Sequence, residues 1–266
     1  MPADTLAGYC EAAAELFLHE ELPVGNSIHG PQDYIESLSA LTKLPHTLVK
    51  MNMGKIYAAM SQIRTVIGGL TRNLPLDLFD RGLSAVDDLE VNFYPVADAL
   101  GVSLPSNAPA VNSLWLPAPV LKIPVLLKPG REDPYTPLRI VQALIAAGFP
   151  KEAFGFYPTT HEGGDTILMQ CGRGIAFGSD ATVRKYAGFP SIQVHGTGRS
   201  KVLIGDDYVG KWEDHTRTLV ESISANGGRS CINTSAILVP SGRDELADAV
   251  ASWDNCVGLD TEFIRT

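Results

Sequence analysis

The chain has 266 residues, of which 45% are hydrophobic and 19% are charged, a composition that supports a sizeable core and argues against wholesale disorder. Its net charge of −9 argues against a general affinity for nucleic acid or for an anionic membrane. The N-terminus lacks the pattern of a signal peptide and no apolar run approaches the length that spans a bilayer, so we expect a cytoplasmic protein.

The first 95 residues have the pattern of helices. Within residues 3–21 the apolar positions at helical spacing are Leu6, Tyr9, Cys10, Ala13 and Phe17. A second series consists of Ile56, Met60, Ile63, Ile67 and Leu70. Glycines 68 and 69 and the stretch 73–75 predict the end of that helix.

From about Val91, short β-rich runs alternate with helical segments. The predicted strands are Leu100–Leu104, Pro124–Leu127, Phe154–Tyr157, Gly174–Phe177 and Ile192–His195. Predicted helices begin at Thr136, where a capping hydroxyl precedes a proline, and cover 165–170 and 182–187. This alternation predicts an α/β fold with a doubly wound, mostly parallel sheet, which binds ligands at the carboxyl ends of its strands.

Beyond Gly198 the alternation continues with a strand at 202–204, a helix at 211–224, a strand at 236–240 and a helix from 244 to 253. We therefore divide the chain into two parts. Residues 1–197 are a helical lead-in plus a cofactor-binding domain. Residues 198–266 are the start of a second α/β domain. The last dozen residues carry no closing feature, so we expect the chain to stop within a series of elements.

The four cysteines, Cys10, Cys171, Cys231 and Cys256, are far apart, and neither a CxxC pair nor an HExxH motif is present, so we expect no metal site. Cys231 follows an Asn-Gly-Gly turn, which can expose a sulfur beside backbone N–H groups that would hold an oxyanion. The alternative is that Cys231 is a small buried hydrophobic residue, the commoner outcome for a lone cysteine.

Three other places could carry chemistry. Gly178 and Ser179 end a strand and open a helix, where a phosphate or an ordinary helix cap would fit equally well. Lys128 ends a strand and could contact a ribose or phosphate, although most lysines are solvated surface charges. His195 is a candidate base, with a structural hydrogen-bonded histidine as the commoner alternative. No GxGxxG is present, which argues against a plain Rossmann dehydrogenase.

Taken in order, these segments resemble the aldehyde dehydrogenase superfamily over roughly residues 90–250. Residues 104–109, Leu-Pro-Ser-Asn-Ala-Pro, are similar to the family's Pro-Trp-Asn-Phe-Pro turn with Ser106 in place of tryptophan. The resemblance implies that Asn107 helps to hold the oxyanion and that Pro105 lies among the cofactor-binding residues. Residues 125–129 resemble the strand ending in Lys-Pro, which gives Lys128 the ribose contact.

Three further segments complete the resemblance. Residues 175–179 are similar to the family's Phe-Thr-Gly-Ser, which implies that Gly178 and Ser179 lie by the pyrophosphate. Residues 193–200 resemble its Leu-Glu-Leu-Gly-Gly-Lys-Ser segment. Residues 228–231 resemble the Gly-Gln-x-Cys segment, which makes Cys231 the nucleophile.

The sequence departs from the family pattern at two site positions. The general-base glutamate falls on His195, so either the histidine activates water or the acyl group passes to coenzyme A or phosphate. The acidic residue that contacts the adenosine ribose falls on Arg131, which would attract a 2′-phosphate, so we favour NADP over NAD. The chain also ends earlier than family members do, as a fragment or a reduced relative would.

The resemblance therefore implies an NAD(P)-dependent oxidoreductase that acts on an aldehyde or activated acyl group through a cysteine thioester. One alternative is a coenzyme A-acylating aldehyde dehydrogenase, or acyl-CoA reductase. The other is a catalytically inactive relative that binds nucleotide or another protein. The expected partners are a small-molecule aldehyde or acyl substrate, with a homo-oligomer left open, and neither nucleic acid nor a membrane.

Overall fold

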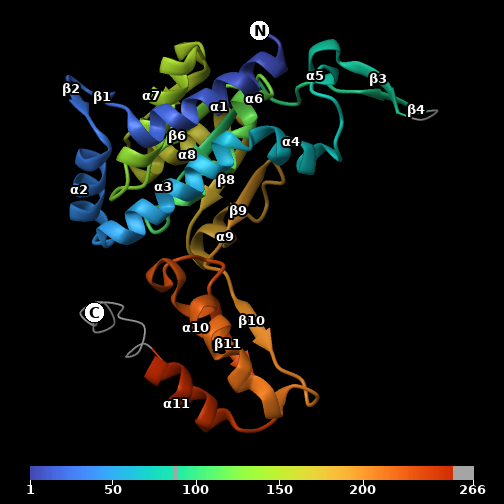
Figure 1. The fold of residues 1–266 in the computed structure, drawn as a ribbon. Coiled ribbons are helices and arrows are strands. Elements are labelled where there is room, and N and C mark those ends of the chain that lie inside the picture. Colours follow the sequence, from blue (N-terminus) through green and yellow to red (C-terminus); the bar gives the residue numbers. More distant parts are fainter. Residues whose placement is uncertain (87–88, 254–266) are drawn as a thin grey trace. The chain divides into compact units, whose positions relative to one another are not determined.

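The computed structural model describes residues 1–86 and 89–253 of the chain, so Cys256 lies outside the described part. It divides the chain into two compact units, Met1–His195 and Gly196–Thr266 (Figure 1). No helix among the described residues is both long enough and apolar enough to cross a membrane.

The first unit begins with helices and two antiparallel hairpins. Their bounds are α1 (Ala3–His19), β1 (Leu22–Val24), β2 (Ser27–His29), α2 (Pro31–Thr42), α3 (His46–Ser61), α4 (Ile63–Thr71), α5 (Leu78–Arg81), β3 (Leu83–Val86) and β4 (Leu89–Asn92). The predicted apolar face of α1 is confirmed, since Leu6, Cys10, Ala13 and Phe17 are buried.

The predicted helix over 56–70 is wrong in one respect, because the chain bends at Gln62 between α3 and α4. Leu70 is 67% exposed, so it does not extend the buried stripe that Ile56, Met60, Ile63 and Ile67 form. The buried stripe therefore continues across the bend from Met60 to Ile63 and ends at Ile67.

The rest of the first unit is a doubly wound α/β fold. Its elements are β5 (Ala99–Ser103), η1 (Pro109–Trp115), α6 (Pro117–Val120), β6 (Val125–Lys128), α7 (Tyr135–Ala147), η2 (Lys151–Ala153), β7 (Phe154–Phe156), α8 (His161–Gln170), β8 (Gly172–Phe177), α9 (Asp180–Tyr186) and β9 (Ile192–His195). The five strands are all parallel in the order β7-β6-β5-β8-β9, which confirms the predicted sheet.

The two faces of this sheet are covered by different helices. The main core contains buried side chains of α1, α3 and α7 together with those of β5 and β6. A smaller core on α8, β8, α9 and β9 consists of Leu168, Ala176, Tyr186 and Ile192. Strand order reverses at β5, because the chain moves outward to β6 and β7 and then returns to β8. Such a switch point opens a crevice at the carboxyl ends of the strands.

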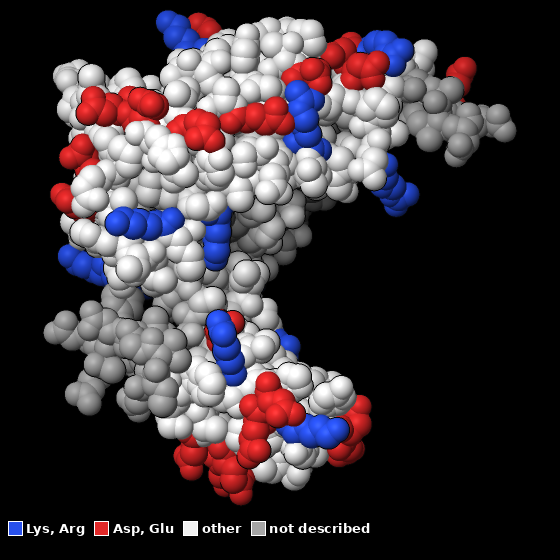
Figure 2. Space-filling model, viewed as in Figure 1, with Lys and Arg blue, Asp and Glu red and all other residues white. Residues whose placement is uncertain are grey.

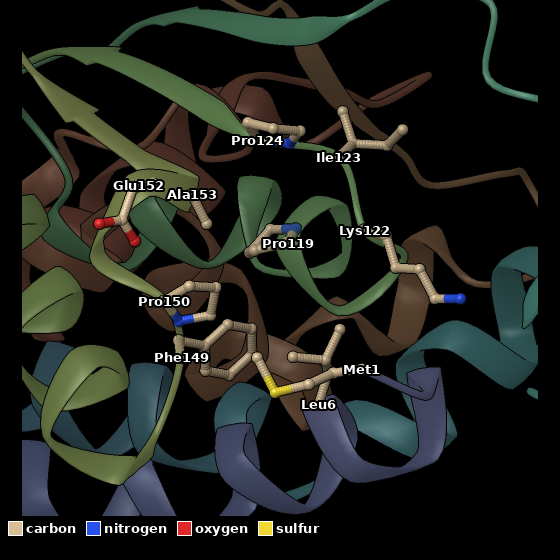
Figure 3. A pocket seen from close by; sticks show the side chains of 10 residues that line it. All are labelled: Met1, Leu6, Pro119, Lys122, Ile123, Pro124, Phe149, Pro150, Glu152 and Ala153. Carbon is tan, nitrogen blue, oxygen red and sulfur yellow. The ribbon is translucent and has the colours of Figure 1, made fainter.

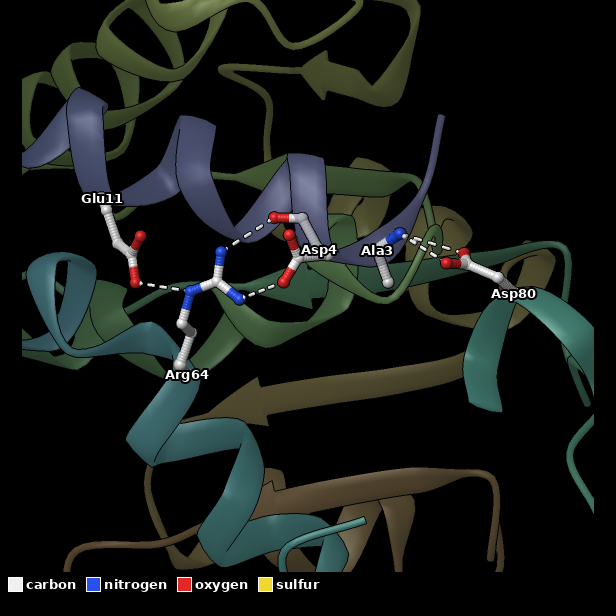
Figure 4. A network of polar contacts seen from close by, with 5 residues as sticks. All are labelled: Ala3, Asp4, Glu11, Arg64 and Asp80. Atoms are coloured by element: carbon white, nitrogen blue, oxygen red, sulfur yellow. Dashed lines mark hydrogen bonds and ion pairs between the residues drawn. The ribbon is translucent and has the colours of Figure 1, made fainter. Parts of the chain in front are cut away.

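A polar network fastens the N-terminal helices to one another (Figure 4). Arg64 of α4 donates to the carboxylates of Asp4 and Glu11 on α1, and Asp80 of α5 accepts the Ala3 N–H at 3.0 Å. Hydrogen bonds with these two carboxylates raise the pKa of Arg64, whereas the Lys122 ammonium lowers the pKa of Asp80. Acidic side chains cover the face that α1 presents in Figure 2.

The second unit contains β10 (Ser200–Leu203), η3 (Val209–His215), α10 (Thr216–Ser224), η4 (Ala225–Gly228), β11 (Thr234–Leu238) and α11 (Arg243–Trp253). Strands β10 and β11 are parallel neighbours. The predicted helix over 211–224 is correct only from Thr216, because Trp212 and His215 lie in a 3-10 turn before it.

Candidate active site

Two adjoining cavities lie at the carboxyl edge of the five-stranded sheet. The larger, of about 1190 Å³, is lined by residues that follow β5, β6, β7 and β8, among them Pro105, Asn107, Lys128, Arg131, His161 and Gly178. The smaller, of about 440 Å³, is lined by Lys128, His161, Ser179 and side chains of α8 and α9. Lys128, His161, Phe177 and Gly178 line both. The loops that meet here are therefore those that the switch point predicts.

Lys128 occupies the wall shared by these cavities. Its side chain runs beneath the first turn of α8, where a Cβ on Gly164 would lie 3.5 Å from the lysine Cγ. The residue is 7% exposed, and burial lowers the pKa of its ammonium, although the nearby Glu132 carboxylate opposes the shift. Within the described residues the ammonium forms no hydrogen bond or ion pair, so its donors are available to a ligand in the cavity.

Residues 129–134 follow Lys128 at the end of β6, and we call this segment the Lys-Pro loop after the pair Lys128 and Pro129. It packs against the loop after β5, because a Cβ on Gly130 would lie 2.6 Å from the carbonyl oxygen of Pro105. The Glu132 N–H donates to the Ser106 hydroxyl at 3.0 Å. These contacts hold Arg131, which is exposed, against the wall of the larger cavity.

Ser179 and His195 occupy the ends of neighbouring strands. Ser179 is the N-cap of α9, but its hydroxyl forms no capping hydrogen bond. His195 is half-buried at the end of β9, where its ring stacks on Phe177 with centroids 4.8 Å apart. The His195 carbonyl accepts the Gly178 N–H at 3.1 Å, so the two strand ends are joined directly.

Cys231 belongs to the second unit. It is half-buried in a tight turn, in which the Ser230 N–H donates to the Asn233 side chain at 2.9 Å. The Asn233 amide in turn donates to the Ile223 carbonyl at 2.7 Å. A Cβ on Gly198, which has φ +71°, would collide with the Cys231 carbonyl oxygen, so glycine is required there. Asn107 and Lys128 belong to the first unit.

Sequence reasoning missed two residues of this edge. His161 lines both cavities at the start of α8, a helix predicted to begin four residues later, at Asp165. The second missed residue is Asp133. The sequence predicts that Thr136 caps α7, but the Thr136 N–H donates at 3.0 Å to the Asp133 carboxylate, which therefore has the capping role. The signal was present, because aspartate three residues before a helical N–H is a favoured cap.

A further cavity of about 320 Å³ lies at the opposite edge of the sheet, beside the residues that precede β6 and β7 (Figure 3). Its side chains are mainly apolar, and they include Leu6, Phe149 and three prolines, Pro119, Pro124 and Pro150. The Lys122 ammonium points away from this apolar group in Figure 3. The polar donors suited to a nucleotide therefore gather at the carboxyl edge. No three His, Cys, Asp or Glu side chains of the described residues come together as a metal site.

Comparison with known proteins identifies one family. Residues 85–253 match the sequence profile of the aldehyde dehydrogenase family. None of the curated protein sequences matches the chain.

Solved structures resemble the chain in fold. A succinate-semialdehyde dehydrogenase from Burkholderia pseudomallei aligns with a TM-score of 0.71 and 15% identity, over 96% of this chain and 52% of that one. A Mycobacterium tuberculosis aldehyde dehydrogenase complexed with NAD+ aligns with a TM-score of 0.73 and 20% identity, over 95% of this chain and 51% of that one. An NADP-dependent enzyme from E. coli aligns with a TM-score of 0.73 and 14% identity, over 96% of this chain and 52% of that one. The predicted fold is confirmed, and the chain spans about half the length of these proteins.

Proposed function

The chain belongs to the aldehyde dehydrogenase family, as its motifs predicted, and we propose that it is an NAD(P)-dependent oxidoreductase that acts on an aldehyde or an activated acyl group. The observation that carries the proposal is the buried ammonium of Lys128, which has no hydrogen-bond or ion-pair partner among residues 1–86 and 89–253 and lies in a cavity at the switch point of the sheet. Open α/β sheets bind nucleotides at such points.

The residues of the carboxyl edge fit a dinucleotide. Lys128 supplies donors for a ribose hydroxyl, and Gly178 and Ser179 would lie by the pyrophosphate, where the first N–H groups of α9 face it. Arg131, at the wall of the same cavity, supplies a planar cation suited to a 2′-phosphate, and this supports NADP over NAD. The two adjoining cavities, of about 1190 and 440 Å³, are large enough for the adenosine half of the cofactor.

In the proposed reaction the Cys231 thiolate attacks the carbonyl carbon of the substrate, and the carbonyl electron pair moves to its oxygen. The Cys231 N–H and the Asn107 side chain hold that oxyanion, each such donor contributing about 3 kcal/mol in related chemistry. A dinucleotide held by Lys128, Arg131 and Ser179 would supply the acceptor for the hydride that leaves the same carbon, so that a thioester on Cys231 would remain. Pro105, on the same loop as Asn107, lines the larger cavity and is proposed to contact the cofactor.

Release of the acyl group requires a second nucleophile. His195 is proposed to take a proton from water, which then attacks the thioester and frees Cys231. A second candidate acceptor is either phosphate or a thiol such as coenzyme A. Transfer to either acceptor needs no general base at position 195. The histidine at position 195, where the family has its general-base glutamate, favours this second candidate.

Replacement of Cys231 by alanine tests the proposal. We expect C231A to lose aldehyde-dependent NADPH formation while its Kd for NADP, measured by fluorescence titration, stays within about twofold of the wild type. The matched control is C171S, since Cys171 lies outside both cavities. An undiminished rate in C231A would overturn the mechanism. A wild type that binds NADP but turns over no aldehyde would support the inactive-relative alternative.

A further inference from the structure

We propose that Asp133 is a positioning residue, which holds the Lys-Pro loop in its ligand-binding conformation by linking it through Thr136 to Tyr34 of α2. The inference rests on the proposed function, because the ligand of this loop is taken to be the dinucleotide. It assigns a binding role to the N-terminal helical layer, which does not line the carboxyl-edge cavities.

The link consists of buried polar groups. Asp133 Oδ1 accepts the Thr136 N–H at 3.0 Å, and the Thr136 hydroxyl lies 2.8 Å from the Tyr34 hydroxyl. Asp133 and Thr136 are 0% exposed and Tyr34 is 2% exposed. Because a buried donor or acceptor that loses its partner costs about 1–3 kcal/mol, each step of this link resists breaking.

The link ends in the loop that carries the ligand donors. Arg131, Glu132 and Pro134 line the larger cavity, whereas Asp133 between them points inward and is fully buried. The neighbouring Glu132 is held by its N–H on Ser106, and on the other side of Arg131 the loop packs at Gly130 against Pro105. Arg131 therefore lies between the Gly130 contact and the anchors at Glu132 and Asp133, and loss of the Asp133 anchor frees it to move away from the cavity wall.

The surroundings of Asp133 indicate that a carboxyl group is kept there against its own desolvation. Burial raises its pKa to about 6, and Oδ2 has no hydrogen-bond partner in the described part of the chain. Burial raises the pKa of Tyr34, and the negative charge of Asp133 raises it further. The positive charge of Arg139 on α7 opposes this shift. The Arg139 guanidinium donates to the backbone carbonyls of Phe17, Glu20 and His29, so these carbonyls and not Asp133 accept its hydrogen bonds.

This arrangement is unfavourable for stability alone. A capping serine or asparagine would accept the same N–H without burying an ionisable group. Residues that weaken stability locally are expected where they serve a site. The geometry therefore favours an anchoring role for Asp133 over a purely structural one.

The test compares D133A and D133N with T42V as the matched control. Thr42 lies on α2, as Tyr34 does, and is buried. Its hydroxyl donates to the Leu38 carbonyl at 2.7 Å and accepts the Leu44 N–H at 3.2 Å, so T42V removes buried hydrogen bonds to residues outside the Lys-Pro loop. Two quantities are measured for each variant at pH 8: the Kd for NADP by fluorescence titration, and hydrogen exchange of the peptide covering residues 129–136 by mass spectrometry. Thermal unfolding confirms that each variant is folded.

We expect D133A to raise the Kd for NADP about tenfold, a ratio equivalent to about 1.4 kcal/mol. Hydrogen exchange of the peptide covering residues 129–136 should become faster by at least the same factor. D133N keeps an acceptor oxygen and should restore both to within about threefold of the wild type. T42V should lower the melting temperature and change neither. Wild-type exchange in D133A would overturn the inference, as would equal effects in T42V. A wild type that fails to bind NADP would contradict the proposed function, while the exchange measurement would still decide whether Asp133 anchors the loop.

Discussion

Gly130 and Pro105 are in such close contact that a methyl group on Gly130 would lie 2.6 Å from the Pro105 carbonyl oxygen. The two residues belong to loops that follow adjacent parallel strands, β6 and β5. Their contact sets the distance between the loop that carries Asn107 and the loop that carries Arg131, and it defines one wall of the larger cavity.

The variant G130A should therefore separate these loops. We expect a loss of roughly 1–3 kcal/mol in the free energy of unfolding, because the clash involves backbone atoms that cannot rotate away. The Kd for NADP should rise about tenfold, since a shift of this loop costs about 1.4 kcal/mol of binding energy. The control is G54A, at a helical glycine with nothing within 4 Å of an added Cβ, which should be neutral or stabilising. Unchanged binding in G130A would contradict this account of the cavity wall.

Charge reversal at Arg131 tests the preference for NADP. In R131E the cation that attracts a 2′-phosphate becomes an anion that repels it, so the ratio of the Kd for NADP to the Kd for NAD should rise at least about tenfold. The control is R173E, which makes the same charge change at the amino end of β8, away from the cavities. If both variants shift the ratio equally, net charge and not the position of Arg131 sets the preference.

Lys128 should affect binding and stability in opposite directions. Because burial lowers the pKa of its ammonium, the charged form is disfavoured in the folded chain, and removing the charge relieves that penalty. K128M keeps the apolar stem over Gly164, so its melting temperature should equal or exceed that of the wild type. Its Kd for the dinucleotide should rise about tenfold or more, as expected for a lost charge-assisted hydrogen bond. A K128M protein that melts lower and binds normally would show that Lys128 is structural. K55M, at an exposed lysine, is the control.

Asp133 should make stability depend on pH. Its folded-state pKa is raised from 3.8 to about 6, so the ionised form is disfavoured on folding. The carboxyl therefore imposes no penalty below the unfolded value, an increasing penalty as pH rises toward 6, and the full penalty above 6. A shift of about two units corresponds to roughly 3 kcal/mol. The stability of D133N relative to the wild type should thus be more favourable at pH 8 than at pH 4 by about 2–3 kcal/mol, measured by urea unfolding. A pH-independent difference would show that Asp133 does not titrate in this range.

The cysteines should differ in their reactivity toward iodoacetamide. Burial raises the pKa of the Cys10 thiol to about 12 and also raises that of Cys171, so both remain protonated and covered at pH 8. Cys231 is only half-buried, and we expect it to be labelled at least about tenfold faster than either, because the thiolate is the reactive species. Bound NADP should change the rate at Cys231 alone, as peptide mapping would reveal. Equal rates at the three positions would count against an active thiol.

The sequence determined the family and the kind of fold. Five short segments in the right order identified the aldehyde dehydrogenase family, and the profile match over residues 85–253 confirms it. The strand and helix series predicted a doubly wound sheet, and the five strands are parallel as expected. This was possible because alternation of strands and helices depends on local periodicity, and because parallel strands with helical crossovers place every second connection at the same edge.

The tertiary structure decided which groups meet at that edge and how they are held. The contact of Gly130 with Pro105, the place of His161 in both cavities, and the link from Asp133 to Tyr34 each join segments far apart in the chain or on different elements. Sequence spacing gives the period of each element, but it does not give the rotation of one element against another. Whether a lysine is solvated, the usual alternative for Lys128, or buried with no partner among the described residues, as observed, depends on that rotation and on the small residues that allow close packing.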